Sequence, residues 1–275
     1  MPSGGEWRRA KQAFSVAARN RNSWLLHLPA NLGLLGLAWA WLWITEATAW
    51  RVVLSLLLAA GIALGAVWLH SATFVFYGQA HREPPARLRS AFARVLGHLP
   101  ACLVLAAVVA ALCWAVFRVG EVWLGAGAAR LSSTFTQATQ TPISPDQARP
   151  VIEGALLGVR WVLIPLVFLP LASRAANGGW RWLRRAGLRE SFHVLRRPAW
   201  WGWYLLLLMM GAVLPRLLLG WVPEFEGLAA QAASLVLRFG VAYLLLIASW
   251  LVLVSLLESR FAGQPQPDVE PGPGE

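Results

Sequence analysis

The sequence predicts an all-α polytopic membrane protein: six transmembrane helices in three parallel repeats of an interfacial amphipathic helix plus a helical hairpin. The first observation is composition, since 57 % of the 275 residues are hydrophobic and 13 % are charged, whereas a soluble domain carries about 25 % charged residues. The second is a series of apolar runs near the roughly 20 residues needed to cross the hydrocarbon core. The third is that an arginine-rich stretch precedes a pair of such runs three times. We therefore expect a single compact membrane domain over residues 1–262.

Six apolar segments are expected to cross the membrane, and the first three contain no charged residue. They cover about 24–45, 52–77, 99–117, 154–173, 199–217 and 235–257. The first follows a basic segment without a clear signal-cleavage site, so we expect it to remain as a signal anchor. Pro29, Pro165 and Pro170 should kink their helices, which neighbouring helices can accommodate in a membrane.

The distribution of basic residues predicts the orientation of the chain. The N-terminal segment, segments 78–98 and 174–198, and Arg260 together hold 17 of the 24 basic residues. Because cytoplasmic loops are enriched in Lys and Arg, these segments are placed in the cytoplasm, and an even number of spans returns the C-terminus there. Tryptophans at the span ends fit aromatic belts at the headgroup level; those on the cytoplasmic side are Trp24, Trp200, Trp201 and Trp203. The predicted location is the bacterial cytoplasmic (inner) membrane.

The three repeat units share a leading segment that is basic and amphipathic. The units cover about 7–77, 85–178 and 180–261, and their leading segments are 7–24, 85–100 and 180–201. Each leading segment carries a small residue followed by Phe, at 13–14, 91–92 and 191–192. Such helices lie in the headgroup plane with arginines toward anionic lipid. The favoured interpretation is that they fix orientation; recognition of lipid headgroups is the alternative.

Two segments outside the spans are predicted to be polar. Residues 118–150 form the longest outer segment, read as a solvated loop after a possible short helix near 119–131. The acidic, Pro/Gly-rich residues 263–275 are expected to be a disordered cytoplasmic tail.

Charged residues within or near the spans suggest one candidate intramembrane polar site. Arg160 and Arg238 occupy similar positions in two repeats, and Glu153 precedes Arg160 by two helical turns. Because an arginine in hydrocarbon is costly and usually faces a partner or a wet cavity, these residues could line a cavity for an anionic solute or lipid phosphate. The alternative is that both arginines sit at the outer interface and pair with glutamates.

No reaction centre is recognisable in the sequence, and we expect a protein that is not an enzyme and carries no cofactor. Walker A, GxGxxG, GxSxG and Cys-based metal motifs are absent. Three histidines near cytoplasmic span ends, His27, His70 and His98, are expected to pack rather than ligate. Because the arginines border apolar spans, the basic charge of +11 indicates anionic lipid headgroups as partners rather than nucleic acid.

The order of leading segment, AF or SF, and two spans, with RSAF at 89–92 and RESF at 189–192, resembles the membrane domain attached to some bacterial glycerophosphodiester phosphodiesterases. It also resembles their stand-alone, mostly uncharacterised relatives. The resemblance covers about 7–261 and implies a membrane module without hydrolase activity, because the catalytic domain of that family is absent. The expected role is a scaffold or lipid-associated support of a protein partner. The alternative is a transporter or permease subunit for a small anionic solute or lipid.

Overall fold

The computed structural model describes residues 4–45, 47–82 and 84–262, which form helices and short connections with no strand among them. The α-helices are α1 (Gly4–Arg19), α2 (Arg21–Leu42), α3 (Ala49–Arg82), α4 (Leu88–Thr139), α5 (Pro145–Gly158), α6 (Ile164–Gly178), α7 (Arg185–Leu195), α8 (Pro198–Leu208), α9 (Leu214–Gly220) and α10 (Leu228–Ala262). The predicted tail, 263–275, lies outside the described residues.

Six helical stretches are long and apolar enough to cross a membrane, which confirms the number of predicted spans. They are Arg21–Leu42, Ala49–Arg82, Leu88–Thr139, Pro145–Leu183, Pro198–Gly220 and Leu228–Ala262. The last is the most enclosed: 56 % of its most apolar stretch is covered by the rest of the chain, against 6–22 % in the other five. The rest of the described chain therefore leaves most of the apolar surface of the first five uncovered.

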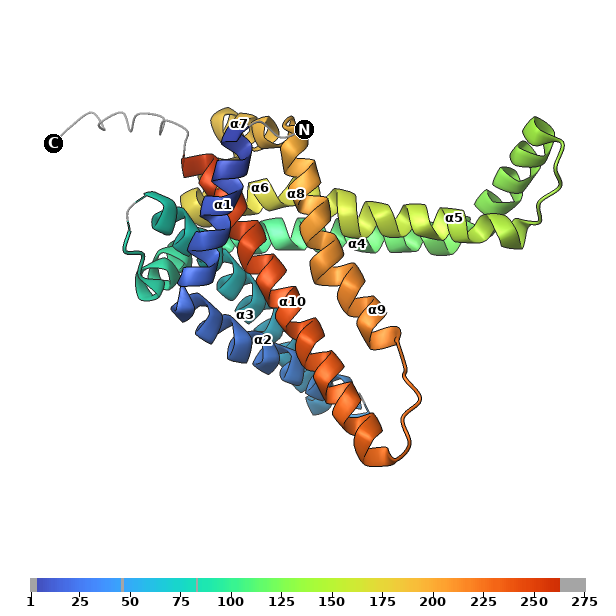
Figure 1. Cartoon of the computed structure of the whole chain (residues 1–275), viewed down its shortest axis with the longest axis horizontal. Helices are drawn as coiled ribbons and strands as arrows, with labels where there is room; N and C mark the ends of the chain where they lie inside the picture. Colours follow the sequence, from blue (N-terminus) through green and yellow to red (C-terminus); the bar gives the residue numbers. More distant parts are fainter. Residues whose placement is uncertain (1–3, 46, 83, 263–275) are drawn as a thin grey trace.

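The buried core occupies one end of the molecule, which we call the hub. It consists mainly of residues 72–77, 91–105, 166–176, 200–207 and 247–261. Figure 1 shows that the α4–α5 hairpin leaves the hub in a different direction from the α2–α3 and α9–α10 hairpins. The expected compact bundle is therefore limited to the hub. Composition does not distinguish a helix packed among other helices from a helix exposed to lipid, because both surroundings are apolar.

Two predicted boundaries are wrong. The leading segment 85–100 is not a separate helix, because α4 begins at Leu88 and continues through Pro100 to Thr139. The predicted loop 118–150 is mostly helical, and α5 already begins at Pro145. Ser144 starts α5 with a capping box, in which its hydroxyl accepts from the Gln147 amide and the Gln147 side chain accepts from the Ser144 amide.

Prolines disturb two of the spanning helices. A π-helical turn, Val159–Leu163, joins α5 to α6 just before Pro165, and another, Met209–Val213, joins α8 to α9 just before Pro215. A proline in a helix lacks an amide donor and its ring clashes with the carbonyl four residues earlier. An inserted residue relieves that clash, so the expected irregularity at Pro165 takes the form of a π-turn.

The N-terminal helix packs against the C-terminal one. Ala10, Ala13 and Ala17 form a fully buried face of α1 that contacts α10. The Ser255 hydroxyl donates to the Ala13 carbonyl at 2.9 Å, and Trp7 stacks on Trp203. The apolar side of this leading segment therefore packs against protein.

Trp200 does not belong to an interfacial belt, contrary to the prediction. Its side chain is fully buried in the hub, where it lies against Tyr204. Its neighbour Trp201 is 39 % exposed. The helical turn places adjacent residues on different faces, so one indole enters the core while the next stays at the surface.

Candidate functional site

The three residues of the predicted intramembrane site each have different partners. Glu153 pairs with Arg149 one turn earlier on α5, with 2.8 Å between the charged atoms, and both side chains are exposed. The Arg160 guanidinium lies 5.2 Å from the centre of the Trp161 ring and 5.9 Å from that of Phe117. The contacts among these described residues do not join Arg160 to Glu153 or to Arg238.

Arg238 holds the end of another helix. Its side chain is buried, at 8 % exposure, and donates to the carbonyls of Leu219 and Trp221 at the end of α9. Carbonyls at a helix C-terminus have no partner within the helix, so this guanidinium supplies one from α10. The contact accounts for a buried arginine without a glutamate.

Replacing Arg238 by leucine is expected to loosen the connection between α9 and α10 and to lower the free energy of unfolding by about 1–2 kcal/mol, because two helix-end carbonyls lose their donor. Hydrogen exchange of the amides in 217–225 should accelerate. Arg216→Leu is the control, because Arg216 lies exposed on α9. Equal exchange in both variants would mean that Arg238 does not hold this turn.

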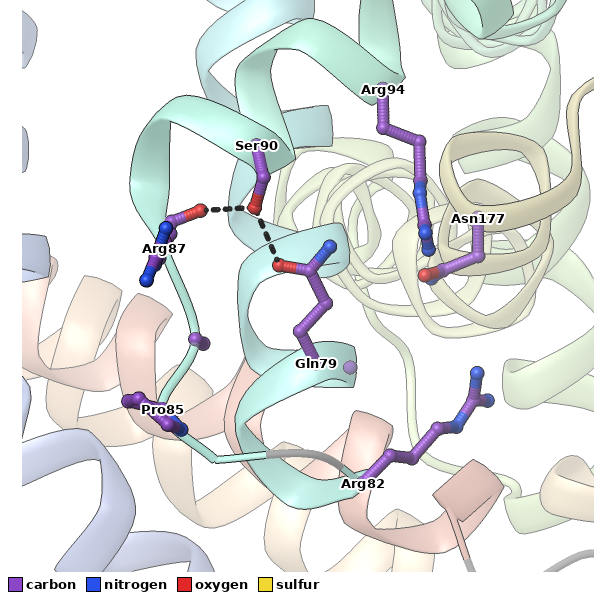
Figure 2. A pocket seen from close by; sticks show the side chains of 9 residues that line it. Gln79, Arg82, Pro85, Arg87, Ser90, Arg94 and Asn177 are labelled. Carbon is purple, nitrogen blue, oxygen red and sulfur yellow. Dashed lines mark hydrogen bonds between the residues drawn. The ribbon is translucent and has the colours of Figure 1, made fainter.

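A basic pocket lies at the hub, where α3, the turn after it, α4 and α6 meet (Figure 2). Its volume is about 340 Å³, and its lining residues are Gly78, Gln79, Arg82, Pro85, Ala86, Arg87, Ser90, Arg94 and Asn177. The nine include three arginines, all exposed to solvent, and no acidic residue. The pocket therefore presents three guanidinium groups from two helices and their connection.

Local contacts shape the wall of the pocket opposite Asn177. The Ser90 hydroxyl lies 2.8 Å from the Arg87 carbonyl and 3.2 Å from the Gln79 side-chain oxygen. These contacts link α4 to α3 across the turn and lie on the side of Arg87, whereas Arg94 lies on the side of Asn177 (Figure 2).

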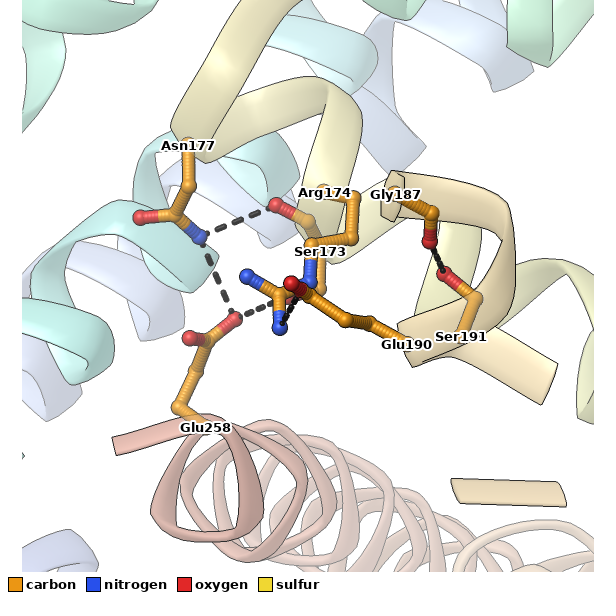
Figure 3. Close-up of polar contacts among 7 residues, drawn as sticks. All are labelled: Ser173, Arg174, Asn177, Gly187, Glu190, Ser191 and Glu258. Carbon is orange, nitrogen blue, oxygen red and sulfur yellow. Dashed lines mark hydrogen bonds and ion pairs between the residues drawn. The ribbon is translucent and has the colours of Figure 1, made fainter. Parts of the chain in front are cut away.

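A buried glutamate lies behind the pocket. Glu258 of α10 is 1 % exposed, and its Oε1 accepts from the Ser173 hydroxyl and, at 3.4 Å, from the Asn177 amide (Figure 3). Its Oε2 has no hydrogen-bond partner among the residues that the structure describes. Arg82 and Arg174 are near enough to interact electrostatically with this carboxylate, so the buried group is placed among positive charges.

Arg174 of α6 contacts two further helices, α7 and α10, close to this glutamate. It forms an ion pair with Glu190 of α7, and its guanidinium carbon lies 3.9 Å from the centre of the Phe261 ring on α10. A cation over an aromatic face is attracted by the quadrupole of the ring. Arg174 thus fixes α6 against α7 and α10 beside the pocket.

The histidines pack in the hub as expected. His27 Nε2 lies 2.7 Å from the Thr73 hydroxyl, which itself donates to the Leu69 carbonyl, so Nε2 carries the hydrogen. His98 Nδ1 contacts the Ala176 carbonyl at 2.8 Å. Among the described residues no cluster of His, Cys, Asp or Glu has a geometry that could hold a metal ion.

No protein-family model, no curated protein and no solved structure matches this chain.

Proposed function

We propose that this chain is a non-enzymatic, multi-pass protein of the bacterial inner membrane, with both termini in the cytoplasm, which binds anionic lipid headgroups and supports a protein partner. The observation that carries the proposal is the basic pocket, with Arg82, Arg87 and Arg94 around a volume of about 340 Å³. Guanidinium groups bind phosphate oxygens through paired hydrogen bonds.

The position of the pocket supports a lipid rather than a solute from the bulk. It lies at the hub end of α3 and α4 and is lined mainly by the arginine-rich segment 78–98, while the apolar surfaces of both helices continue away from it. A phospholipid whose chains run along these surfaces would bring its phosphate to the three arginines. The anionic cytoplasmic leaflet attracts such basic segments.

We further propose that the chain consists of three related repeat units. Each leading segment contains a small residue that is at most 1 % exposed; these residues are Ala13, Ala91 and Ser191. In the second and third units the helices that contain them pack on the last helix of the preceding unit, α4 on α3 and α7 on α6, and α1 of the first unit packs on α10, the last helix of the third. This recurrence supports three repeats whose leading segments surround the hub.

Replacing both Arg82 and Arg94 by glutamine is expected to weaken binding of short-chain phosphatidylglycerol at least about tenfold, because two charge-assisted contacts to the phosphate are lost. Native mass spectrometry of the detergent-solubilised protein would measure the retained lipid. Arg130→Gln is the matched control, since Arg130 is exposed on α4 far along the sequence from the pocket.

Retention of phosphatidylglycerol by the double variant at the wild-type level would reject the pocket as the headgroup site. If Arg130→Gln weakens phosphatidylglycerol binding by the same factor, the effect reflects the net charge of the protein and not the pocket. Thermal unfolding of each variant shows whether the fold is preserved, as we expect for exposed arginines.

A further inference from the structure

We propose that the basic pocket selects a phosphate that carries a primary ammonium group, the phosphoethanolamine headgroup. The inference rests on the proposed function and identifies the ligand of the same site. It is based on one hydrogen-bond acceptor at the wall of the pocket, the Asn177 oxygen, and on a buried carboxylate behind Gly78, that of Glu258.

The acceptor is the side-chain oxygen of Asn177. The amide nitrogen of this residue donates to the Ser173 carbonyl at 2.9 Å and to Glu258 Oε1 at 3.4 Å. A carbonyl only accepts hydrogen bonds, so the nitrogen must face Ser173. The Asn177 oxygen consequently points away from these partners and into the pocket, as Figure 2 shows.

The carboxylate is that of Glu258, whose Oε2 has no hydrogen-bond partner among the described residues. A Cβ atom on Gly78 would lie 3.0 Å from this oxygen and 3.2 Å from the Asn177 oxygen. Both oxygens therefore lie directly beside Gly78, which lines the pocket. Glu258 does not line the pocket itself, so its carboxylate can attract a cation bound there through its charge, with the Asn177 oxygen as the direct contact.

The pocket and the residue behind it thus offer two chemically different kinds of group. Arg82, Arg87 and Arg94 provide donors and positive charge, which suit a phosphate diester. Asn177 and Glu258 provide acceptors and negative charge, which suit a group with several N–H donors. A primary ammonium supplies three such donors, and in phosphoethanolamine it is only two carbons from the phosphate ester oxygen. Choline has the same charge but no N–H, so it should bind less well.

The competing explanation is that Glu258 only offsets the positive charge of Arg82 and Arg174, with which it interacts. The two explanations predict opposite effects of Glu258→Gln. Loss of a charge-balancing glutamate should strengthen binding of every anionic lipid. Loss of an ammonium partner should specifically weaken binding of the ethanolamine lipid.

The experiment compares short-chain phosphatidylethanolamine, phosphatidylcholine and phosphatidylglycerol by native mass spectrometry of the full chain. We expect the wild type to bind the ethanolamine lipid about tenfold more tightly than the choline lipid, the effect of a charge-assisted hydrogen bond. In Glu258→Gln this ratio should fall to about one, while phosphatidylglycerol binding is unchanged or stronger. A ratio in Glu258→Gln equal to that of the wild type would overturn the proposal.

Gly78→Ala tests the same geometry without a change of charge. Its methyl group should cover both acceptor oxygens and lower the ethanolamine-to-choline ratio while the arginines still bind phosphatidylglycerol. Gly97→Ala is the matched control, because a Cβ at Gly97 meets no atom within 4 Å. If Gly78→Ala retains the wild-type ratio, the Asn177 oxygen does not contact the ligand.

Free phosphoethanolamine, added as a competitor, distinguishes the source of the headgroup. If free phosphoethanolamine competes as strongly as the lipid, the ligand of the pocket is the soluble compound. If it competes more weakly, the ligand is the membrane phospholipid. Both results support the phosphate–ammonium chemistry. If no anionic lipid binds the wild type, the proposed function itself fails. If ethanolamine and choline lipids bind equally well while phosphatidylglycerol binding still needs Arg82 and Arg94, only the selectivity fails.

Discussion

Replacing Glu6 by alanine is expected to lower the free energy of unfolding by about 3 kcal/mol, because it leaves a buried guanidinium without its counter-charge. Glu6 Oε2 lies 2.8 Å from Arg260, whose side chain is only 3 % exposed. The other carboxylate oxygen lies 3.8 Å from Arg197 at the start of α8. Glu6 therefore holds α1 against α8 and α10, and its loss should release the N-terminal helix.

Denaturant titration in detergent micelles would measure this change. The matched control is Glu121→Ala, which breaks an ion pair with Arg118 whose side chains are 44 % and 56 % exposed. Such exposed pairs contribute about 0–1 kcal/mol. An equal decrease in the free energy of unfolding of the two variants would show that burial of Arg260 does not determine the stability of the contact between α1 and α10.

Replacing Trp200 by alanine should cost about 4 kcal/mol, because the largest fully buried side chain of the hub would leave a cavity. Lipid cannot compensate, since Trp200 is surrounded by protein. The neighbouring Trp201 is the control: it is 39 % exposed, and its indole donates to the Leu195 carbonyl at 2.7 Å. Alanine there should cost about 1 kcal/mol, mainly for the hydrogen bond.

The same detergent titration applies, with near-ultraviolet circular dichroism as a check that tertiary packing survives. A Trp201→Ala loss as large as that of Trp200→Ala would contradict a protein core at the hub. It would instead support the belt interpretation made from the sequence, in which both indoles lie at the headgroup level.

The number of spans could be predicted because it depends on the length of each apolar run, which is a local property. Helix ends were less predictable. The second leading segment was expected to end at residue 100, yet α4 continues through Pro100. A proline removes one amide donor, and the apolar surroundings of a helix favour keeping the remaining backbone bonds. Polar residues near Thr139 suggested a loop, but Thr139 donates to the Phe135 carbonyl inside the helix.

The pocket could be predicted only in part. Positive-inside counting placed Arg82, Arg87 and Arg94 on one side of the membrane, but did not show that they surround a cavity. Asn177 and Glu258 were missed because they come from helices about 80 residues apart in sequence and meet only when α6 packs near α10. The one available signal was Glu258 itself, an isolated acid directly after the apolar run of the last span.

Arg160 and Arg238 illustrate the opposite error. Both were conspicuous as charges near apolar sequence, yet Arg238 donates to backbone carbonyls and the Arg160 guanidinium lies near two aromatic rings. Neither type of partner is visible in a sequence search that looks for nearby acids. Charge in an apolar run is thus evidence for some partner, but not for which one.

The packing of α1 on α10 sets an order of events during synthesis. Glu6 and Arg260 are 254 residues apart, so the first helix leaves the ribosome long before its binding surface on the last helix exists. Until translation is nearly finished, the alanine face of α1 lacks the surface that buries it in the complete chain. Completion of the hub therefore reports that the last span has been inserted, and a chain truncated before α10 would expose its N-terminal helix to quality-control proteases.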